Sequence, residues 1–548
     1  MKGQGFEFIK KNKSVALLLV VCILVVLFSG CNIPKSHQQT GTPENGPTNQ
    51  VTSDAESPTP TVAITATPTV TPTPVPFSVP IDEENFPDEM FRNWVERNHD
   101  IDRNGILTEH DVRLEVTVNF PEYYYDMKSL KGIEYFYDLK VLTCHYNQIE
   151  DVDLSKLTKL QTINLSGNHI KSIKISGLPN LQELNVDGNL LTRLDLIGLP
   201  NLQKLSCAYN QLTSIDLSGL PKLKELDVEG NQLTNLDLSG LPDLEKLSCG
   251  GNEYMQVDIS NLPKLKELKY TNSKLPSLDV SGLPNLQKLD CSDNYLSGID
   301  ISMLVNLTEL NCKSNELTSL DLHGLTQLSV LDCAGNKMKT LDVSGLTNLE
   351  ILNCGSNLIS SLDVSDLSNL NELNCSGNKR LKVINIGDIN KLTVFNCSGA
   401  FLDYFDVSNL TELQTLYCSG CGLASLDVSN LSKLEVFDCR NNNLTSLNVS
   451  GLSRLRILNC QNNRLTDLDV SNLPMLVSVV CDENELKNLN VSGSTKISYL
   501  KCEKNKLTKL DIRDLTELEM LYCSRNCLKG IDTSKQKKLS TFSYNPQY

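Results

Sequence analysis

Apolar and polar residues recur in a unit of 21 residues, which reads L-x-x-L-x-C-x-x-N-x-L-x-x-L-D-V-S-G-L-x-x in one-letter code. In the first half the two kinds alternate, so that Leu310 and Cys312 face one way while Asn311 and Lys313 face the other. This alternation predicts a short strand. The second half carries further leucines along a return path. No unit buries so many leucines alone, so the units must stack.

One asparagine marks each unit, in a series that runs from Asn147 to Asn526 and gives nineteen units. Its side chain has two donor hydrogens and an acceptor, so stacked copies can bond the backbone of the next coil. One extra residue is inserted near Lys379, and we expect a bulge or a local change of curvature over residues 378–406. Three slots hold another residue: Ser273, Ala400 and Cys421.

The repeat pattern resembles the leucine-rich repeat family, and its length and L-D-V-S return path are similar to the bacterial internalin-type branch. The resemblance covers residues 130–548. It implies a repeat solenoid shaped as a horseshoe, with a parallel β-sheet on the concave face and a partner bound there.

The N-terminus predicts export. Four lysines precede an apolar run from Val15 to Phe28, which is typical of a signal-peptide core and short for a membrane span. The run ends in Leu27-Phe28-Ser29-Gly30-Cys31, which is similar to a bacterial lipobox. Residues 1–30 are therefore predicted to be a lipoprotein signal peptide, with Cys31 as the lipidated residue. An uncleaved membrane anchor is the alternative, and both leave the repeats outside the membrane.

Residues 31–80 are rich in Pro and Thr and offer few apolar side chains to bury. They are expected to form a disordered, extended tether. The chain is then lipid-anchored at the extracellular face of a bacterial membrane and projects through the cell wall. Gram-positive surface lipoproteins have similar tethers, although nothing in the sequence excludes Gram-negative placement.

Residues 81–129 are predicted to form a small helical cap around an EF-hand-like loop. Oxygen-bearing side chains occupy loop positions 1, 3, 5 and 12, with Gly105 at position 6 and Leu107 at position 8. The alternative is a polar turn in which Thr108 and the acid at position 12 form a helix capping box. The predicted ligands of one structural calcium ion are Asp100, Asp102, Asn104, Ile106 and Asp111.

Fifteen of the nineteen cysteines, from Cys144 to Cys523, share one inward slot, which holds Leu, Val or Tyr in the other units. A slot with that tolerance is an apolar packing position, so we expect free buried thiols. A soft-metal ladder is the alternative, but the slot lacks paired C-x-x-C clusters. Cys421, three residues after Cys418, leaves a local disulfide or a reactive thiol open.

One outward column of the predicted sheet alternates in charge from Glu183 to Glu309 and turns apolar after Val330. A row of apolar side chains on a concave sheet indicates an interaction surface, although packing against neighbouring loops would explain it too. A neighbouring column of Asn and Asp could form hydrogen bonds to a glycan or to a peptide backbone, or its side chains could form a ladder of hydrogen bonds among themselves with no ligand. The predicted ligand-binding residues are Val394, Tyr417, Val436, Ile457, Tyr499, Met520 and Tyr522.

No catalytic constellation is apparent, because the six histidines occupy unrelated slots and no nucleophile has a positioned base. The net charge of −16 argues against a nucleic-acid ligand. The sequence therefore predicts a non-enzymatic, surface-anchored protein that recognises a protein or a glycan. The alternative is a structural or self-associating spacer of the cell envelope.

Overall fold

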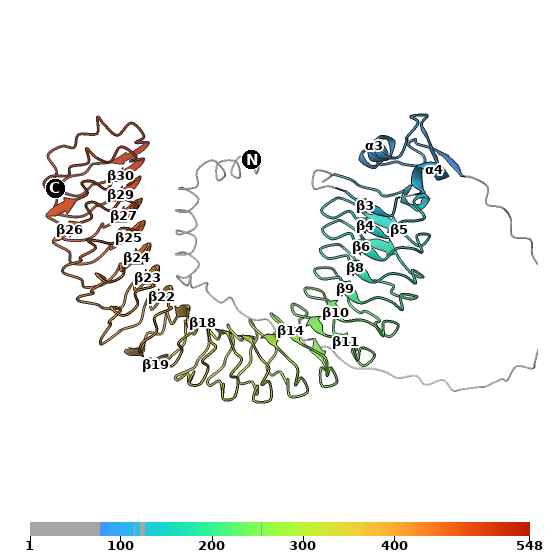
Figure 1. The fold of residues 1–548 in the computed structure, drawn as a ribbon, viewed down its shortest axis with the longest axis horizontal. Helices are drawn as coiled ribbons and strands as arrows, with labels where there is room; N and C mark the ends of the chain where they lie inside the picture. Colours follow the sequence, from blue (N-terminus) through green and yellow to red (C-terminus); the bar gives the residue numbers. More distant parts are fainter. Residues whose placement is uncertain (1–76, 114, 121–125, 254) are drawn as a thin grey trace, which may run out of the picture. The chain divides into compact units, whose positions relative to one another are not determined.

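The computed structural model describes residues 77–113, 115–120, 126–253 and 255–548. These residues belong to one compact unit, a curved solenoid of stacked coils (Figure 1). The predicted signal peptide, Cys31 and the tether up to residue 76 lie outside the described residues. Within the described part, no helix has both the length and the apolar character that a membrane span requires.

A parallel sheet of 21 short strands lines the inside of the curve (Figure 1). Each residue pairs with its equivalent in the next coil, as Leu310 does with Leu331. Nineteen of these strands, β4 to β30, belong to the predicted units, and one further strand flanks them at each end. The predicted solenoid and its concave sheet are therefore confirmed. The strands are β3 (Thr117–Asn119), β4 (Val141–Thr143), β6 (Thr162–Asn164), β8 (Glu183–Asn185), β9 (Lys204–Ser206), β10 (Glu225–Asp227), β12 (Lys246–Ser248), β14 (Glu267–Lys269), β15 (Lys288–Asp290), β16 (Glu309–Asn311), β17 (Val330–Asp332), β18 (Ile351–Asn353), β20 (Glu372–Asn374), β22 (Val394–Asn396), β23 (Thr415–Tyr417), β24 (Val436–Asp438), β25 (Ile457–Asn459), β27 (Ser478–Val480), β29 (Tyr499–Lys501), β30 (Met520–Tyr522) and β31 (Thr541–Ser543).

Four short two-stranded sheets lie on the outer side of the solenoid, where the chain returns (Figure 1). Their strands are parallel and join neighbouring coils. The sequence analysis predicted a return path there without assigning strands to it. The pairs are β5 (Asp151–Asp153) with β7 (Ser172–Lys174), β11 (Asn235–Leu236) with β13 (Gln256–Val257), β19 (Ser361–Asp363) with β21 (Val383–Asn385), and β26 (Asp467–Asp469) with β28 (Asn488–Asn490).

The repeated asparagine joins two coils from a buried position. The Asn315 amide nitrogen donates to the carbonyl oxygens of Cys291 (3.0 Å) and Cys312 (3.1 Å), and its oxygen accepts from the Leu296 N–H (3.0 Å). The bonded neighbour is thus the preceding coil, whereas the sequence analysis expected the next one. In all nineteen units the residue before this slot has a positive φ, as at Ser314 (φ 53°), which turns the chain out of the strand.

Two irregular units are accommodated locally. Where Ser273 replaces the asparagine, Tyr270 fills the cysteine slot and its hydroxyl donates to the Met255 carbonyl. The extra residue at Lys379 is absorbed in a turn, and Glu372 still pairs with Val394 in the concave sheet. The expected bulge is therefore a turn outside the sheet.

The interior is one continuous apolar cluster of leucines and cysteines. All cysteines among the described residues have free thiols, and sixteen of them are buried, with Cys527 exposed. Burial raises the pKa of the Cys354 thiol to about 12. The prediction of free buried thiols is confirmed.

The N-terminal cap consists of β1 (Ser78–Pro80), α3 (Glu89–Asn98), β2 (Ile106–Thr108) and α4 (Glu109–Val112), followed by the 3-10 helix η1 (Ile133–Tyr135). It is less helical than predicted, because β1 forms an antiparallel pair with β2. Asp88 caps α3 by accepting from the Met90 N–H (2.9 Å), and its second oxygen accepts from the Lys128 N–H (2.7 Å). One carboxylate thereby joins the cap to the first coils.

Candidate functional site

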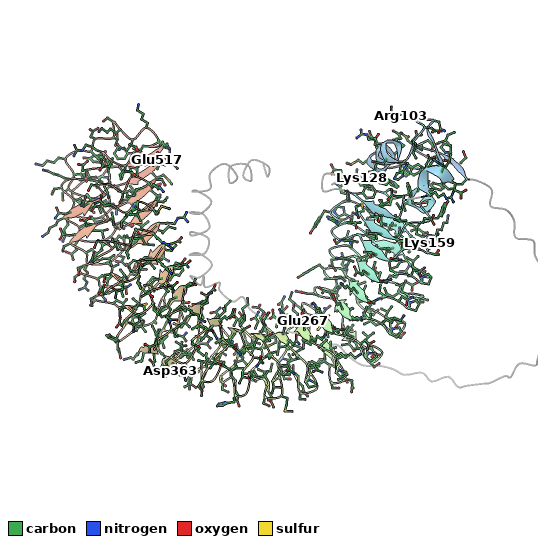
Figure 2. All side chains as sticks on the ribbon, in the orientation of Figure 1. Arg103, Lys128, Lys159, Glu267, Asp363 and Glu517 are labelled. Carbon is green, nitrogen blue, oxygen red and sulfur yellow. The ribbon has the colours of Figure 1, made fainter. Side chains whose placement is uncertain are left out.

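The first and third residues of the concave strands form two columns on the hollow side, the first and the second, and nearly all of them are exposed or half-buried, with Ser478 and Asp438 buried. In the early coils the first column alternates in charge, and four of its six neighbouring pairs are ion pairs, from 2.5 Å between Lys288 and Glu309 to 3.9 Å between Lys204 and Glu225. Glu267 of this column points into the hollow, whereas Asp363 lies on the outer side (Figure 2). A groove of about 860 Å³ runs along these strands, between Thr143 and Asp332.

The predicted ligand-binding residues lie farther along the same sheet, and we call them together the apolar surface. All seven are half-buried, so each keeps part of its side chain accessible. The rings of Tyr499 and Tyr522 lie 5.8 Å apart between centroids and tilt by 49°. The structure thus brings the predicted residues onto neighbouring strands, whereas the groove of about 860 Å³ lies in the other half of the sheet. The apolar surface consists of Val394, Tyr417, Val436, Ile457, Tyr499, Met520 and Tyr522.

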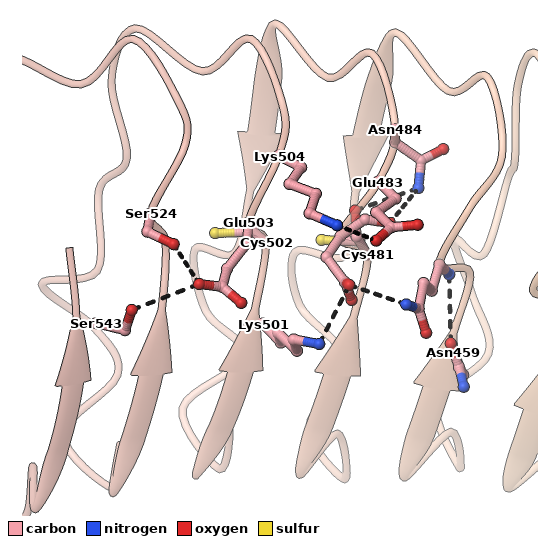
Figure 3. Close-up of polar contacts among 12 residues, drawn as sticks. Asn459, Cys481, Glu483, Asn484, Lys501, Cys502, Glu503, Lys504, Ser524 and Ser543 are labelled. Carbon is pink, nitrogen blue, oxygen red and sulfur yellow. Dashed lines mark hydrogen bonds and ion pairs between the residues drawn. The ribbon is translucent and has the colours of Figure 1, made fainter. Parts of the chain in front are cut away.

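A third column, which the sequence analysis missed, borders the apolar surface two residues beyond the second column. Gln461 donates to Asp482 (3.0 Å). Glu503 accepts hydrogen bonds from the hydroxyls of Ser524 and Ser543 (Figure 3). The 21-residue spacing contains the signal for this column, because polar residues recur there between the inward cysteine and the asparagine. These side chains form a polar rim along one edge of the apolar surface.

Two carboxylates beside the apolar surface are buried. Asp438 is 5% exposed and Asp482 is 3% exposed, and burial raises the pKa of both. Arg440 (3.3 Å) and Lys501 (3.2 Å) partly offset that effect on Asp438 and Asp482, respectively. Among the residues that the structure describes, the Oδ1 atom of Asp482 has no hydrogen-bond partner, so this buried group keeps unused acceptor capacity.

Of the predicted calcium ligands, Asp100, Asp102 and Asn104 lie in the turn after α3, whereas Ile106 begins β2 and Asp111 lies in α4. Asp100 accepts from the N–H groups of Asn104 and Gly105 (both 3.0 Å), and Asn104 accepts from the Ile106 N–H (2.7 Å). Asp111 forms the capping box with Thr108 that the alternative interpretation predicted. In the described part of the chain, no three His, Cys, Asp or Glu side chains are grouped closely enough to hold a metal ion.

Family models match several stretches of the solenoid. A model described as Leucine Rich repeats (2 copies) matches residues 137–178, 158–198, 179–220, 200–240 and 326–369, and one described as Leucine Rich Repeat matches residues 285–307. The chain therefore contains leucine-rich repeats. The comparison with curated proteins found no match.

Solved structures share the fold. YopM from Yersinia enterocolitica is 20% identical over 83% of this chain and 94% of its own, with a TM-score of 0.52. The Arabidopsis receptor kinase HAESA, solved with a peptide hormone and a co-receptor, is 19% identical over 79% and 82%, also with a TM-score of 0.52. The functional domain of InlJ from Listeria monocytogenes, which includes a cysteine ladder, is 27% identical over 81% and 79%, with a TM-score of 0.42.

Proposed function

We propose that this protein is a non-enzymatic, surface-anchored binding protein that recognises a partner through the apolar surface. The observation that carries the proposal is the row of half-buried aliphatic and tyrosine side chains on strands β22 to β30. The early coils differ, because their outward charges already pair with one another. Leucine-rich repeat solenoids commonly use such concave surfaces for binding.

A protein partner fits this surface better than a glycan does. Protein interfaces combine a core of aromatic and aliphatic side chains with a polar rim, and the third column supplies such a rim beside Tyr499 and Tyr522. A glycan ligand remains an outcome of the test below.

Replacing Tyr417, Tyr499 and Tyr522 together by serine is expected to abolish binding. Tyrosines at the centre of an interface typically contribute about 2 kcal/mol or more each, so even one replacement should weaken binding by about 30-fold. The immobilised full chain would be probed with purified extracellular proteins and with a glycan array, and the affinity of each hit measured for both variants.

The matched control replaces Tyr146, Tyr209 and Tyr295 by serine. These three are more exposed (63%, 59% and 58%) and lie outside the apolar surface, so their loss should leave binding unchanged. Equal loss in both triple variants would refute the assignment. A wild-type chain that self-associates, and that becomes monomeric only when Tyr417, Tyr499 and Tyr522 are replaced, would instead favour the envelope-spacer function.

We further propose that the protein is held at the extracellular face of a bacterial membrane by a lipid on Cys31, behind a tether that spans the cell wall. The support is the order of charged, apolar and small residues before Cys31. Labelled palmitate should enter the wild-type chain but not Cys31→Ala, which should leave the membrane fraction. Equal labelling and equal membrane retention of the two chains would contradict the anchor.

We also propose that one calcium ion stiffens the cap, with oxygens from Asp100, Asp102, Asn104, Ile106 and Asp111. The loop has the required tight turn, with φ of +74° at Gly105. Strand β1 pairs with β2, in the place where the loop of a second EF-hand would otherwise pair. A single hand stabilised in this way suits a structural role.

Calcium is expected to raise the unfolding midpoint of the cap. A ligand present at 100 times its dissociation constant raises the free energy of unfolding by about 2.7 kcal/mol. Trp94 is the only tryptophan of the chain and lies against His99, with ring centroids 4.7 Å apart, so its fluorescence reports on the cap directly. Asp100→Ala should abolish the calcium effect, whereas Asp82→Ala, in a turn outside the loop, should keep it. If calcium leaves the unfolding midpoint of the wild-type cap unchanged, the calcium proposal is wrong, and the capping box alone explains the sequence of the loop.

A further inference from the structure

The asparagine column is interrupted in two successive coils, at Ala400 and Cys421. On either side the pattern is intact. The Asn378 amide donates to the Cys375 carbonyl oxygen (2.9 Å), and the Asn442 amide donates to the Cys439 carbonyl oxygen (2.9 Å). At position 400 the side chain has no polar group. The interruption directly follows the extra turn at Lys379, so the most irregular part of the solenoid also lacks two amides.

The Cys421 thiol takes over one of the missing contacts. It donates to the Cys397 carbonyl oxygen at 3.1 Å, which is the carbonyl 24 residues earlier that an asparagine amide bonds in the regular coils. A side chain in this slot reaches back toward the preceding coil. Because of that direction, the Cys421 sulfur also lies 3.9 Å from the Cys397 sulfur.

This sulfur pair differs from the rest of the cysteine column. Cysteines on adjacent strands occupy the same slot, so their side chains run parallel, which disfavours a disulfide. Cys397 and Cys421 come from different slots and point toward one another. Among the described residues, theirs is the only hydrogen bond between two thiols. The sequence analysis considered Cys418 as the neighbour of Cys421, and the structure gives Cys397 instead.

We propose that Cys397 and Cys421 form a disulfide bond that links two adjacent coils when the protein meets hydrogen peroxide. Both side chains are buried, at 0% and 1% exposed, and peroxide is close to water in size. The sulfurs must close from 3.9 Å to a bond of ~2.05 Å. This inference does not depend on the proposed binding function.

The reaction balances in two steps. The Cys421 sulfur attacks one peroxide oxygen, the O–O bond breaks, and the departing hydroxide takes the thiol proton, which leaves a sulfenic acid and water. The Cys397 sulfur then attacks the Cys421 sulfur, the S–O bond breaks, and hydroxide leaves as water with the Cys397 proton. Two thiols lose two electrons in total, and one peroxide becomes two waters.

The electrostatics support Cys421 as the residue that reacts first. Its contact with the Cys397 thiol lowers the pKa of Cys421, whereas burial raises the pKa of Cys397. The lower pKa gives Cys421 the larger thiolate fraction, and the thiolate is the reactive form. A buried cysteine next to it is then placed to resolve the sulfenic acid.

The disulfide would strengthen the interrupted joint. Cys397 directly follows β22 and Cys421 lies four residues after β23, so the bond would fix these two strands against one another. They carry Val394 and Tyr417 of the apolar surface. Oxidation would therefore restore covalently the coil-to-coil attachment that the two missing asparagines do not provide.

Peptide mapping without reduction tests the proposal. The full chain is treated with peroxide until the exposed Cys527 is fully oxidised, which shows that the dose is adequate. The expected result is a cross-linked peptide joining Cys397 and Cys421, two hydrogens lighter than the separate peptides. Hydrogen exchange over residues 394–421 should slow at the same time.

Two variants make the test specific. Cys421→Asn restores the regular amide and should fold, but should show neither the cross-link nor the slower exchange. Cys418→Val, in a slot that already accepts Val186 and Val228, should keep both. Free thiols at Cys397 and Cys421 after complete oxidation of Cys527, or a link from Cys418 to Cys421, would overturn the proposal.

Discussion

The solenoid depends on one buried side-chain amide, which recurs in sixteen of its nineteen coils. At Asn315 a single side chain satisfies two carbonyl groups and one N–H group, and these groups belong to two different coils. Buried backbone groups are costly when left unpaired, so the amide fixes both the position and the spacing of the coils. The positive φ before each asparagine slot is the backbone geometry that brings the side chain to this place.

The sequence alone was sufficient to predict the features that follow from the 21-residue period. It predicted the nineteen coils, the concave sheet and the buried thiols, because leucine, cysteine and asparagine each occupy a fixed slot. It did not predict the outer two-stranded sheets, since β19 and β21 have the same alternation as coils without such pairing. The contact between Cys397 and Cys421 was also missed, because it depends on how a side chain in the asparagine slot is directed across a coil boundary.

The candidate site follows from a contrast between two halves of one sheet. In the early coils the outward charges neutralise each other, as in the ion pair of Lys246 with Glu267 (3.3 Å), although the groove of about 860 Å³ lies there. In the later coils the same position holds apolar or aromatic side chains such as Val436, Ile457 and Tyr499. When a partner covers them, apolar side chains contribute more binding free energy than charges that are already paired. The kind of side chain, and not the depth of the groove, therefore favours the later half as the binding site.

Hydrogen exchange in an asparagine variant tests the central claim most directly. In Asn315→Ala, the Leu296 N–H loses its acceptor and two carbonyls lose a donor, so amides over residues 291–317 should exchange at least about tenfold faster than in the wild type. Asn306→Ala removes an exposed amide bonded to the Pro284 carbonyl and should leave exchange unchanged. Equal exchange in the two variants would contradict the claim that the asparagine column holds the coils together.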